Sequence, residues 1–131
     1  TQAVTTATFT KVQYATKTRD THGWYDNVTN YRYTPLAPGT YMVAVAVAFD
    51  SVTATKEVIV SIYRNGAELF RGSRAAVSAS TFHDAPAACL VAMNGATDYL
   101  EVFAYHDHGS DRNITAGALA NYFTATRVSN I

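Results

Sequence analysis

The sequence predicts an all-β fold, built as an antiparallel sandwich, jelly roll or small barrel. Apolar and polar residues alternate with period two along several stretches, which is the pattern of half-buried strands. Clusters of Gly, Pro, Asn and Asp separate these stretches, and helical periodicity is almost absent. With 131 residues, the chain has the size of one domain with one core.

The expected strands follow one another from residue 8 to the end of the chain. Residues 1–8 (TQAVTTAT) are interpreted as a linker from a preceding segment, so the domain is assigned to residues 9–131. Alternating side chains predict strands at five places, namely residues 8–16, 39–50, 57–70, 98–106 and 121–130. Within residues 57–70, Asn65-Gly66 predicts a hairpin turn because both residues tolerate positive φ. Residues 70–84 (FRGSRAAVSASTFHD) are expected to form a loop region.

The strand at residues 39–50 (GTYMVAVAVAFD) is apolar on both faces. Its large face contains Tyr41, Val43, Val45, Val47 and Phe49, and its small face contains Met42, Ala44, Ala46 and Ala48. A strand on the surface of a monomeric sandwich should show a polar face to water. The large face therefore belongs to the core, and the small face is interpreted as a subunit interface. The alternative is that a loop of the same chain covers it.

Composition and charge exclude several classes of partner. Lys+Arg and Asp+Glu are both 10, so the chain has no basic field for nucleic acid or for anionic lipid. The longest apolar stretch, YMVAVAVAF, is too short to span a bilayer. Cys89 is the single cysteine, so no internal disulfide can form, and its apolar surroundings indicate an inert thiol.

Several motifs, in the same order, resemble the globular C1q-like domains of the C1q/tumour-necrosis-factor jelly-roll superfamily. Residues 23–47 (GWYDNVTNYRYTPLAPGTYMVAVAV) resemble the family's Gly-x-Tyr-Asp run, aromatic-Thr pair, Pro-x-x-Gly-x-Tyr turn and apolar strand. The stretches VIVSIYRNG, NGATDYLEVFAY and NYFTATRVS are similar to its later strands. The resemblance covers about Phe9 to Val128. The departures are Tyr33 in place of Phe, a longer TPLAPG turn and a more polar last strand.

This resemblance implies a C1q/TNF-like jelly roll that assembles as a homotrimer. Members of the family form compact homotrimers, bind proteins or glycans, and are not typically enzymes. In the family, the strand after the Pro-x-x-Gly-x-Tyr turn belongs to the inner sheet, which faces the threefold axis. The resemblance thus accounts for the apolar small face that the alternation already indicates.

The segment YHDHGSDRN (residues 105–113) holds the densest group of ionisable side chains. Its charged or titratable residues are His106, Asp107, His108, Asp111 and Arg112. Two imidazoles at i and i+2 of an extended chain point the same way and could share Zn²⁺ or Ni²⁺, but a site needs further ligands. Two carboxylates are too few for Ca²⁺. The segment is interpreted as a polar loop that contacts a ligand, and no metal or cofactor is assigned. The alternative that stays open is a metal site completed by the same residues of three chains around a threefold axis.

Aromatic and planar side chains mark two further candidate binding regions. Trp24, Tyr31 and Arg32 combine ring faces with a guanidinium group, which suits sugar rings and protein hot spots. Arg71 and Arg74 lie in the expected loop at residues 70–84. No Ser lies in a nucleophile elbow, and paired carboxylates across a cleft cannot be recognised from the sequence.

The sequence therefore predicts a non-enzymatic head domain that binds a protein receptor or a cell-surface glycan. Its partners would be two further copies of itself and that receptor, without nucleic acid or membrane insertion. A composition rich in Ala and Thr is typical of a bacterial surface protein or a phage tail-fibre tip, outside the cell or on a virion. Two alternatives remain open: a structural trimerisation cap for a fibre, with no ligand, and a small polysaccharide hydrolase or lyase.

Overall fold

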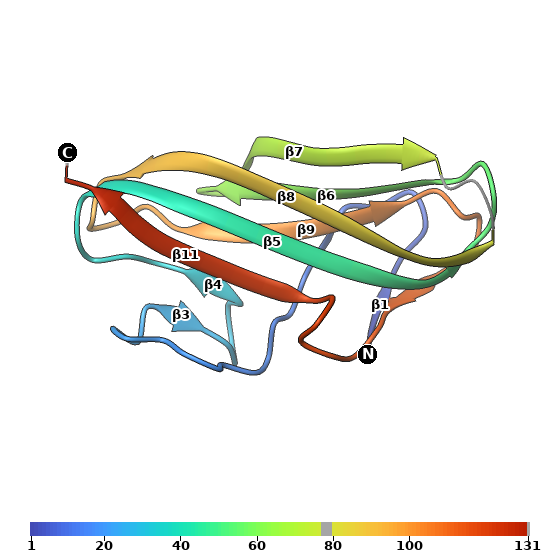
Figure 1. The fold of residues 1–131 in the computed structure, drawn as a ribbon, viewed down its shortest axis with the longest axis horizontal. Coiled ribbons are helices and arrows are strands. Elements are labelled where there is room, and N and C mark those ends of the chain that lie inside the picture. The colour runs from blue at the N-terminus through green and yellow to red at the C-terminus, as the bar shows by residue number, and fades with distance from the viewer. Residues whose placement is uncertain (77–79, 131) are drawn as a thin grey trace.

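Two antiparallel sheets packed face to face make up the fold in the computed structural model, which describes residues 1–76 and 80–130 (Figure 1). The all-β prediction is confirmed. The described residues contain no helix with the length and hydrophobicity needed to cross a membrane. The strands are β1 (Gln2–Val4), β2 (Thr10–Lys11), β3 (Tyr25–Asp26), β4 (Arg32–Tyr33), β5 (Gly39–Val52), β6 (Glu57–Arg64), β7 (Ala67–Ala76), β8 (Thr81–Met93), β9 (Leu100–His106), β10 (Arg112–Ile114) and β11 (Tyr122–Ser129).

Strand β5 lies at the centre of the first sheet, here called sheet A. It pairs with β8 along one edge, and with β11 and β10 along the other, while β1 pairs with β10. Sheet B has the order β3-β4-β9-β6-β7, with β2 beside β9. The large face of β5 is buried against sheet B, as the alternation predicts: Tyr41, Val43, Val45, Val47 and Phe49 are each at most 1% exposed.

The hairpin predicted at Asn65-Gly66 is confirmed. Arg64 and Ala67 are paired residues at the ends of β6 and β7, so the turn consists of these two residues alone. Asn65 has φ 54° and Gly66 has φ 80°, which is the geometry that two-residue hairpins require. Val58, Val60 and Ile62 of β6 are buried in the core on one face.

The loop predicted for residues 70–84 is wrong for most of its length. Strand β7 continues to Ala76 and β8 begins at Thr81, so Arg71 and Arg74 lie on a strand. Gly72 is required on β7 because a Cβ at this position would clash with the Pro86 carbonyl oxygen of β8. This glycine thus marks the close approach of β7 to β8 rather than a turn.

The N-terminal residues also differ from the prediction. Residues 2–4, expected to be linker, form β1, and Val4 is fully buried in the core. The expected strand at residues 8–16 is reduced to Thr10–Lys11. Beyond β2 the chain leaves both sheets until β3, and this irregular stretch shapes the candidate site.

Truncating Phe49 should destabilise the domain strongly. Its ring is fully buried and lies edge-on to His106, with centroids 5.6 Å apart. We expect Phe49→Ala to lower the free energy of unfolding by about 3–5 kcal/mol, because a cavity remains. Urea unfolding followed by circular dichroism measures this loss. Leu119→Ala, at a fully exposed side chain, is the control and should change stability by less than about 0.5 kcal/mol.

Candidate binding groove and exposed sheet face

A groove of about 810 Å³ lies between the irregular segment 14–25 and strand β11, and is here called the β11 groove. Its volume is in the range of small-ligand and peptide sites. One wall is formed by residues 16–22, and the other by the consecutive residues Tyr122–Arg127. In Figure 1 this blue segment passes below the red β11 on its way to β3.

The floor of the groove is aromatic and centres on Phe123. Tyr25, Tyr33 and Tyr14 surround its ring, with centroid distances of 5.4, 5.7 and 6.4 Å. The Tyr14 hydroxyl donates a hydrogen bond to the Ala46 carbonyl oxygen at 2.9 Å, which ties the segment to β5. Burial raises the pKa of Tyr14, Tyr25 and Tyr33, so these phenols stay neutral and the floor carries no charge.

A row of rings leads from the core to the surface beside the groove. Tyr41 contacts Tyr33, Tyr33 contacts Trp24, and Trp24 stacks on His22, with centroid distances of 6.0, 6.3 and 4.2 Å. Tyr41 is 1% exposed, whereas His22 is exposed. Because the row rests on buried rings, Trp24 is held in position at the rim although residues 17–24 belong to no strand.

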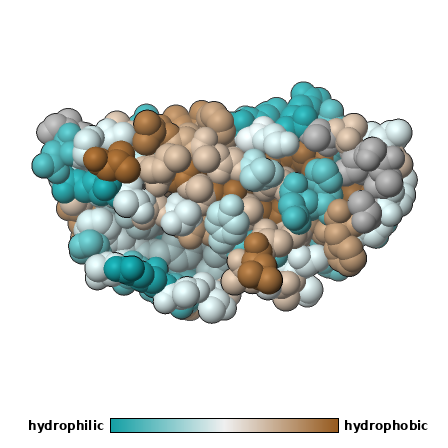
Figure 2. All heavy atoms as spheres, in the orientation of Figure 1, coloured by the Kyte–Doolittle hydropathy of each residue, from teal (hydrophilic) through white to brown (hydrophobic). Residues whose placement is uncertain are grey.

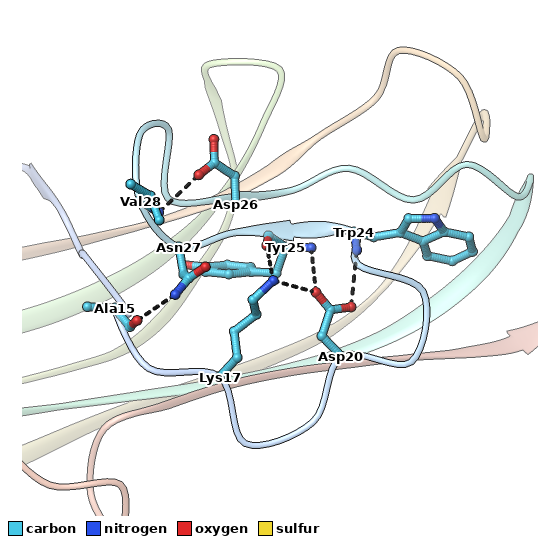
Figure 3. Close-up of polar contacts among 8 residues, drawn as sticks. All are labelled: Ala15, Lys17, Asp20, Trp24, Tyr25, Asp26, Asn27 and Val28. Carbon is cyan, nitrogen blue, oxygen red and sulfur yellow. Dashed lines mark hydrogen bonds and ion pairs between the residues drawn. The ribbon is translucent and has the colours of Figure 1, made fainter.

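Asp20 organises the irregular wall of the groove (Figure 3). Its carboxylate accepts hydrogen bonds from the backbone N–H groups of Trp24 and Tyr25, each at 3.1 Å, and pairs with Lys17 at 3.2 Å. Lys17 also donates to the Tyr25 carbonyl oxygen at 3.0 Å. Burial acts to raise the pKa of Asp20, but these hydrogen bonds and Lys17 outweigh it, so the pKa lies below the ordinary value of 3.8.

Cations outnumber anions along the groove. Lys17, Arg19 and Arg127 face a single carboxylate, Asp20, which leaves an excess of two positive charges in a chain with no formal net charge. Lys17 is already paired with Asp20. Arg127 donates to the Pro38 carbonyl oxygen, and Arg19 makes no hydrogen bond or ion pair within the described residues. The groove therefore favours an anionic ligand.

The outer face of sheet A is the second feature, and Figure 2 looks onto it. Apolar side chains lie across β5 and β8 in that view, interrupted by more polar positions. Met42 is 44% exposed, Leu90 65% and Tyr122 41%. Of the four predicted interface residues, Met42 is exposed and Ala44 is partly exposed, whereas Ala46 and Ala48 are 6% and 4% exposed within the single chain. The small face is thus partly covered by its own neighbours.

Residues 107–111, between β9 and β10, form a loop that connects three parts of the chain, whereas the ends of the predicted segment lie on those two strands. The Asp107 carboxylate accepts from the Glu57 N–H at 2.6 Å, and Asp111 accepts from the Thr6 N–H at 3.3 Å. The Thr6 hydroxyl in turn accepts from the Gly109 N–H at 2.9 Å. These two carboxylates are engaged with the backbone, which matches the predicted polar loop at one end of the sandwich.

His106 is fully buried, so it has no surface with which to contact a ligand, and it leaves the set of candidate contacts. Its Nε2–H donates to the Val4 carbonyl oxygen at 2.9 Å, and its Nδ1 accepts from the His108 N–H at 3.2 Å. A neutral imidazole has no further capacity. His108 accepts from the Thr53 N–H at 3.1 Å and contacts Arg112. Within residues 1–76 and 80–130, no three potential ligands gather as a metal site.

The remaining candidate residues lie apart from the groove, except for Trp24. Arg32 stacks over the Tyr99 ring at 4.5 Å, and Tyr31, with φ 49°, lies beside a smaller hollow. Arg71 pairs with Glu68 at 2.7 Å, and Arg74 pairs with Glu57 at 3.0 Å. The structure therefore does not bring these arginines together as one site.

Sequence reasoning missed most of the groove. The residues it did not select are Lys17, Arg19, Asp20, His22, Tyr122 and Arg127. The run KTRDTHGW (residues 17–24) offered a signal, because four of its side chains are charged or titratable beside the single Trp. The turn-forming residues of this run predict only a boundary between strands.

Comparisons with known proteins define the fold. No family model matches the chain, and no curated protein matches it. The structure of Eiger TNF from S. frugiperda is similar at 12% identity and a TM-score of 0.58, covering 82% of this chain and 69% of that one. Two structures of murine APRIL are also similar. The structure at pH 5.0 has 14% identity and a TM-score of 0.60, and the match covers 96% of this chain and 96% of that one. The structure at pH 8.5 has 19% identity and a TM-score of 0.52, and the match covers 74% of this chain and 70% of that one.

At these identities the likeness concerns the fold. The chain has a TNF-like jelly roll, which confirms the fold that the resemblance to the C1q/tumour-necrosis-factor superfamily implied. Two antiparallel sheets with a central β5 match that prediction, and the groove lies at the edge of sheet A.

Replacing Asp20 should cost stability at neutral pH and much less in acid. A carboxyl whose pKa is lower in the folded state stabilises that state above its ordinary pKa of 3.8, and the contribution is lost as pH falls through the folded value. We expect Asp20→Asn to lower the free energy of unfolding by about 1–3 kcal/mol at neutral pH, and by progressively less as the pH falls below 3.8. Urea unfolding at neutral and at acid pH tests this.

Asp111→Asn is the control for Asp20→Asn, because Asp111 is exposed and accepts one long hydrogen bond. It should have a small effect at both pH values. If Asp20→Asn lowers the free energy of unfolding by the same amount at neutral and at acid pH, the role assigned to the charged carboxylate is contradicted.

Proposed function

We propose that the chain is a trimeric, non-enzymatic recognition head that binds a protein receptor or a cell-surface glycan. In this proposal the outer face of sheet A forms the contacts between subunits, and the β11 groove is the binding site. The head would stand at the end of a longer fibrous or surface protein, such as a bacterial adhesin or a phage tail fibre, outside the cell or on a virion.

One observation carries the trimeric part of the proposal: a sheet face with one charged residue, although most of its outward positions are open to solvent. On β5, β8 and β11 its outward positions are Met42, Ala44, Ala46, Ala48, Phe82, Asp84, Pro86, Ala88, Leu90, Ala92, Tyr122, Thr124 and Thr126. Asp84 is the single charged residue among them. Charged residues are depleted at the centres of subunit interfaces, and small side chains such as Ala44 and Ala88 permit close approach.

Support for recognition comes from the groove and from the fold. Exposed His22 stacked on Trp24, next to Arg19, offers a ring face and an unpaired cation to a ligand. One of the similar solved structures is described as a TNF, and the resemblance in sequence implies receptor or glycan binding. Three grooves in one trimer would gain avidity on a repetitive surface even if each binds weakly.

Light scattering of the isolated domain tests the subunit face. We expect a mass of three times the 14.2 kDa chain, unchanged by a chelator. Leu90→Glu should reduce the mass to that of one chain, because a carboxylate cannot be buried in an apolar contact without a partner. Leu69→Glu, at a 41% exposed position on sheet B, is the matched control and should remain trimeric. A monomeric native domain would contradict the trimer.

Groove variants test recognition separately from assembly. We expect His22→Ala with Arg19→Ala to weaken attachment to target cells, or signals on a glycan array, by at least about tenfold. Arg32→Ala is the control, because its guanidinium stacks on Tyr99 outside the groove. If trimers of the His22→Ala, Arg19→Ala variant attach as well as native trimers, the groove is not the binding site. A trimer that assembles but attaches to nothing would instead favour a structural cap.

A further inference from the structure

Strand β11 has a free backbone edge inside the groove. It is the last strand of sheet A in the order β1-β10-β5-β11, so within the described residues β5 is its one neighbour. All six consecutive residues Tyr122–Arg127 line the groove. Side chains of a strand alternate between the two faces of its sheet. Six residues in a row can line one groove only when that groove follows the edge of the strand.

Alternation of the pairing shows which backbone groups point to that edge. Ala48 directs both its N–H and its C=O to the edge of β5 that pairs with β10 and β11, where they bond the Asn121 side chain and the Thr115 N–H. Two and four residues earlier, Ala46 and Ala44 share this direction and are paired with Tyr122 and Thr124. The intervening residues of β11 therefore turn their N–H and C=O groups outward. These are Phe123 and Ala125.

The edge lacks the devices that usually protect such strands. Proteins block free edges with charges, prolines or bulges. Residues 122–126 (YFTAT) contain neither a charge nor a proline, and the irregularity in pairing comes only between Arg127 and Ser129. The outward backbone groups of Phe123 and Ala125 are two residues apart, which is about 6.6 Å along the strand. An extended peptide presents its own backbone groups at the same interval.

We propose that the β11 groove binds an extended, acidic peptide segment of the receptor, which adds to sheet A as a further strand beside β11. This inference rests on the proposed recognition function and specifies its partner. The outward groups of Phe123 and Ala125 bond the backbone of the incoming strand, and Arg19 and Arg127 bind its carboxylates. A second copy of β11 is disfavoured as the occupant, because it would bring its own Arg127 toward these cations.

Amide hydrogen exchange measured by NMR tests the geometry with a defined probe. The probe is an eight-residue peptide of alternating Val and Glu; its controls are the Val–Lys peptide and the Val–Glu peptide N-methylated at alternate residues. In the free domain the Phe123 and Ala125 amides should exchange fast and those of Tyr122 and Thr124 slowly. The Val–Glu peptide should slow exchange at Phe123 and Ala125 at least about tenfold, and neither control should do so.

Variants then separate edge pairing from simple charge attraction. Ala125→Pro removes an outward N–H that the pairing with β5 does not use, so binding should fall at least about tenfold while the fold survives. Arg32→Ala, whose guanidinium stacks on Tyr99 outside the groove, is the control and should bind normally. If circular dichroism shows that Ala125→Pro is unfolded, Arg19→Glu is used instead. This variant should lower the affinity for the Val–Glu peptide and raise the affinity for the Val–Lys peptide.

The outcomes distinguish this inference from the proposed function. A trimer that attaches to cells but leaves Phe123 and Ala125 unprotected by the Val–Glu peptide overturns the strand-addition inference alone. Binding of an oligogalacturonate in place of the peptide also overturns it, and assigns the groove to an acidic glycan. A monomer that attaches to nothing overturns the proposed function itself.

Discussion

The pairing of β5 on both of its edges is the constraint on which the rest of the structure depends. Its large side chains fill the space between the sheets, while β8 and β11 occupy its two edges. Small residues on the other face give sheet A a largely uncharged outer surface. The core and the exposed face therefore both originate from one strand that is apolar on both faces between Tyr41 and Phe49, and the groove follows the strand that pairs with its edge.

The groove exists because a loop, rather than a strand, lies beside β11. Segment 14–25 has little strand pairing of its own, and Asp20 satisfies its backbone N–H groups with a carboxylate in place of a neighbouring strand. Tyr14 and Tyr25 anchor the segment through their rings against Phe123. A rigid aromatic floor is thus combined with an unpaired strand edge, and the two together leave room for an incoming chain.

Elements set by local pattern could be predicted from the sequence. The β6–β7 hairpin follows from Asn65-Gly66, and the buried face of β5 follows from alternation. The extent of β7 could not be predicted, because Gly72 suggested a turn and is explained instead by the close approach of β8, a distant segment. The groove was missed for the same reason: residues 16–22 and 122–127 meet only in the folded chain. The sequence predicted His106 as a ligand contact at the surface. In the structure its imidazole is buried and bonds the Val4 carbonyl oxygen, more than a hundred residues away in the chain.

The stacked pair of His22 and Trp24 gives the domain an optical property of its own. Trp24 is the only indole in the chain, so all tryptophan emission originates at the rim of the groove. An imidazole 4.2 Å from the indole is close enough to quench that emission, and more strongly when it is protonated. Any molecule that displaces His22 or covers Trp24 changes the fluorescence of the unmodified protein. The native chain therefore contains a built-in reporter of occupancy, with no label required.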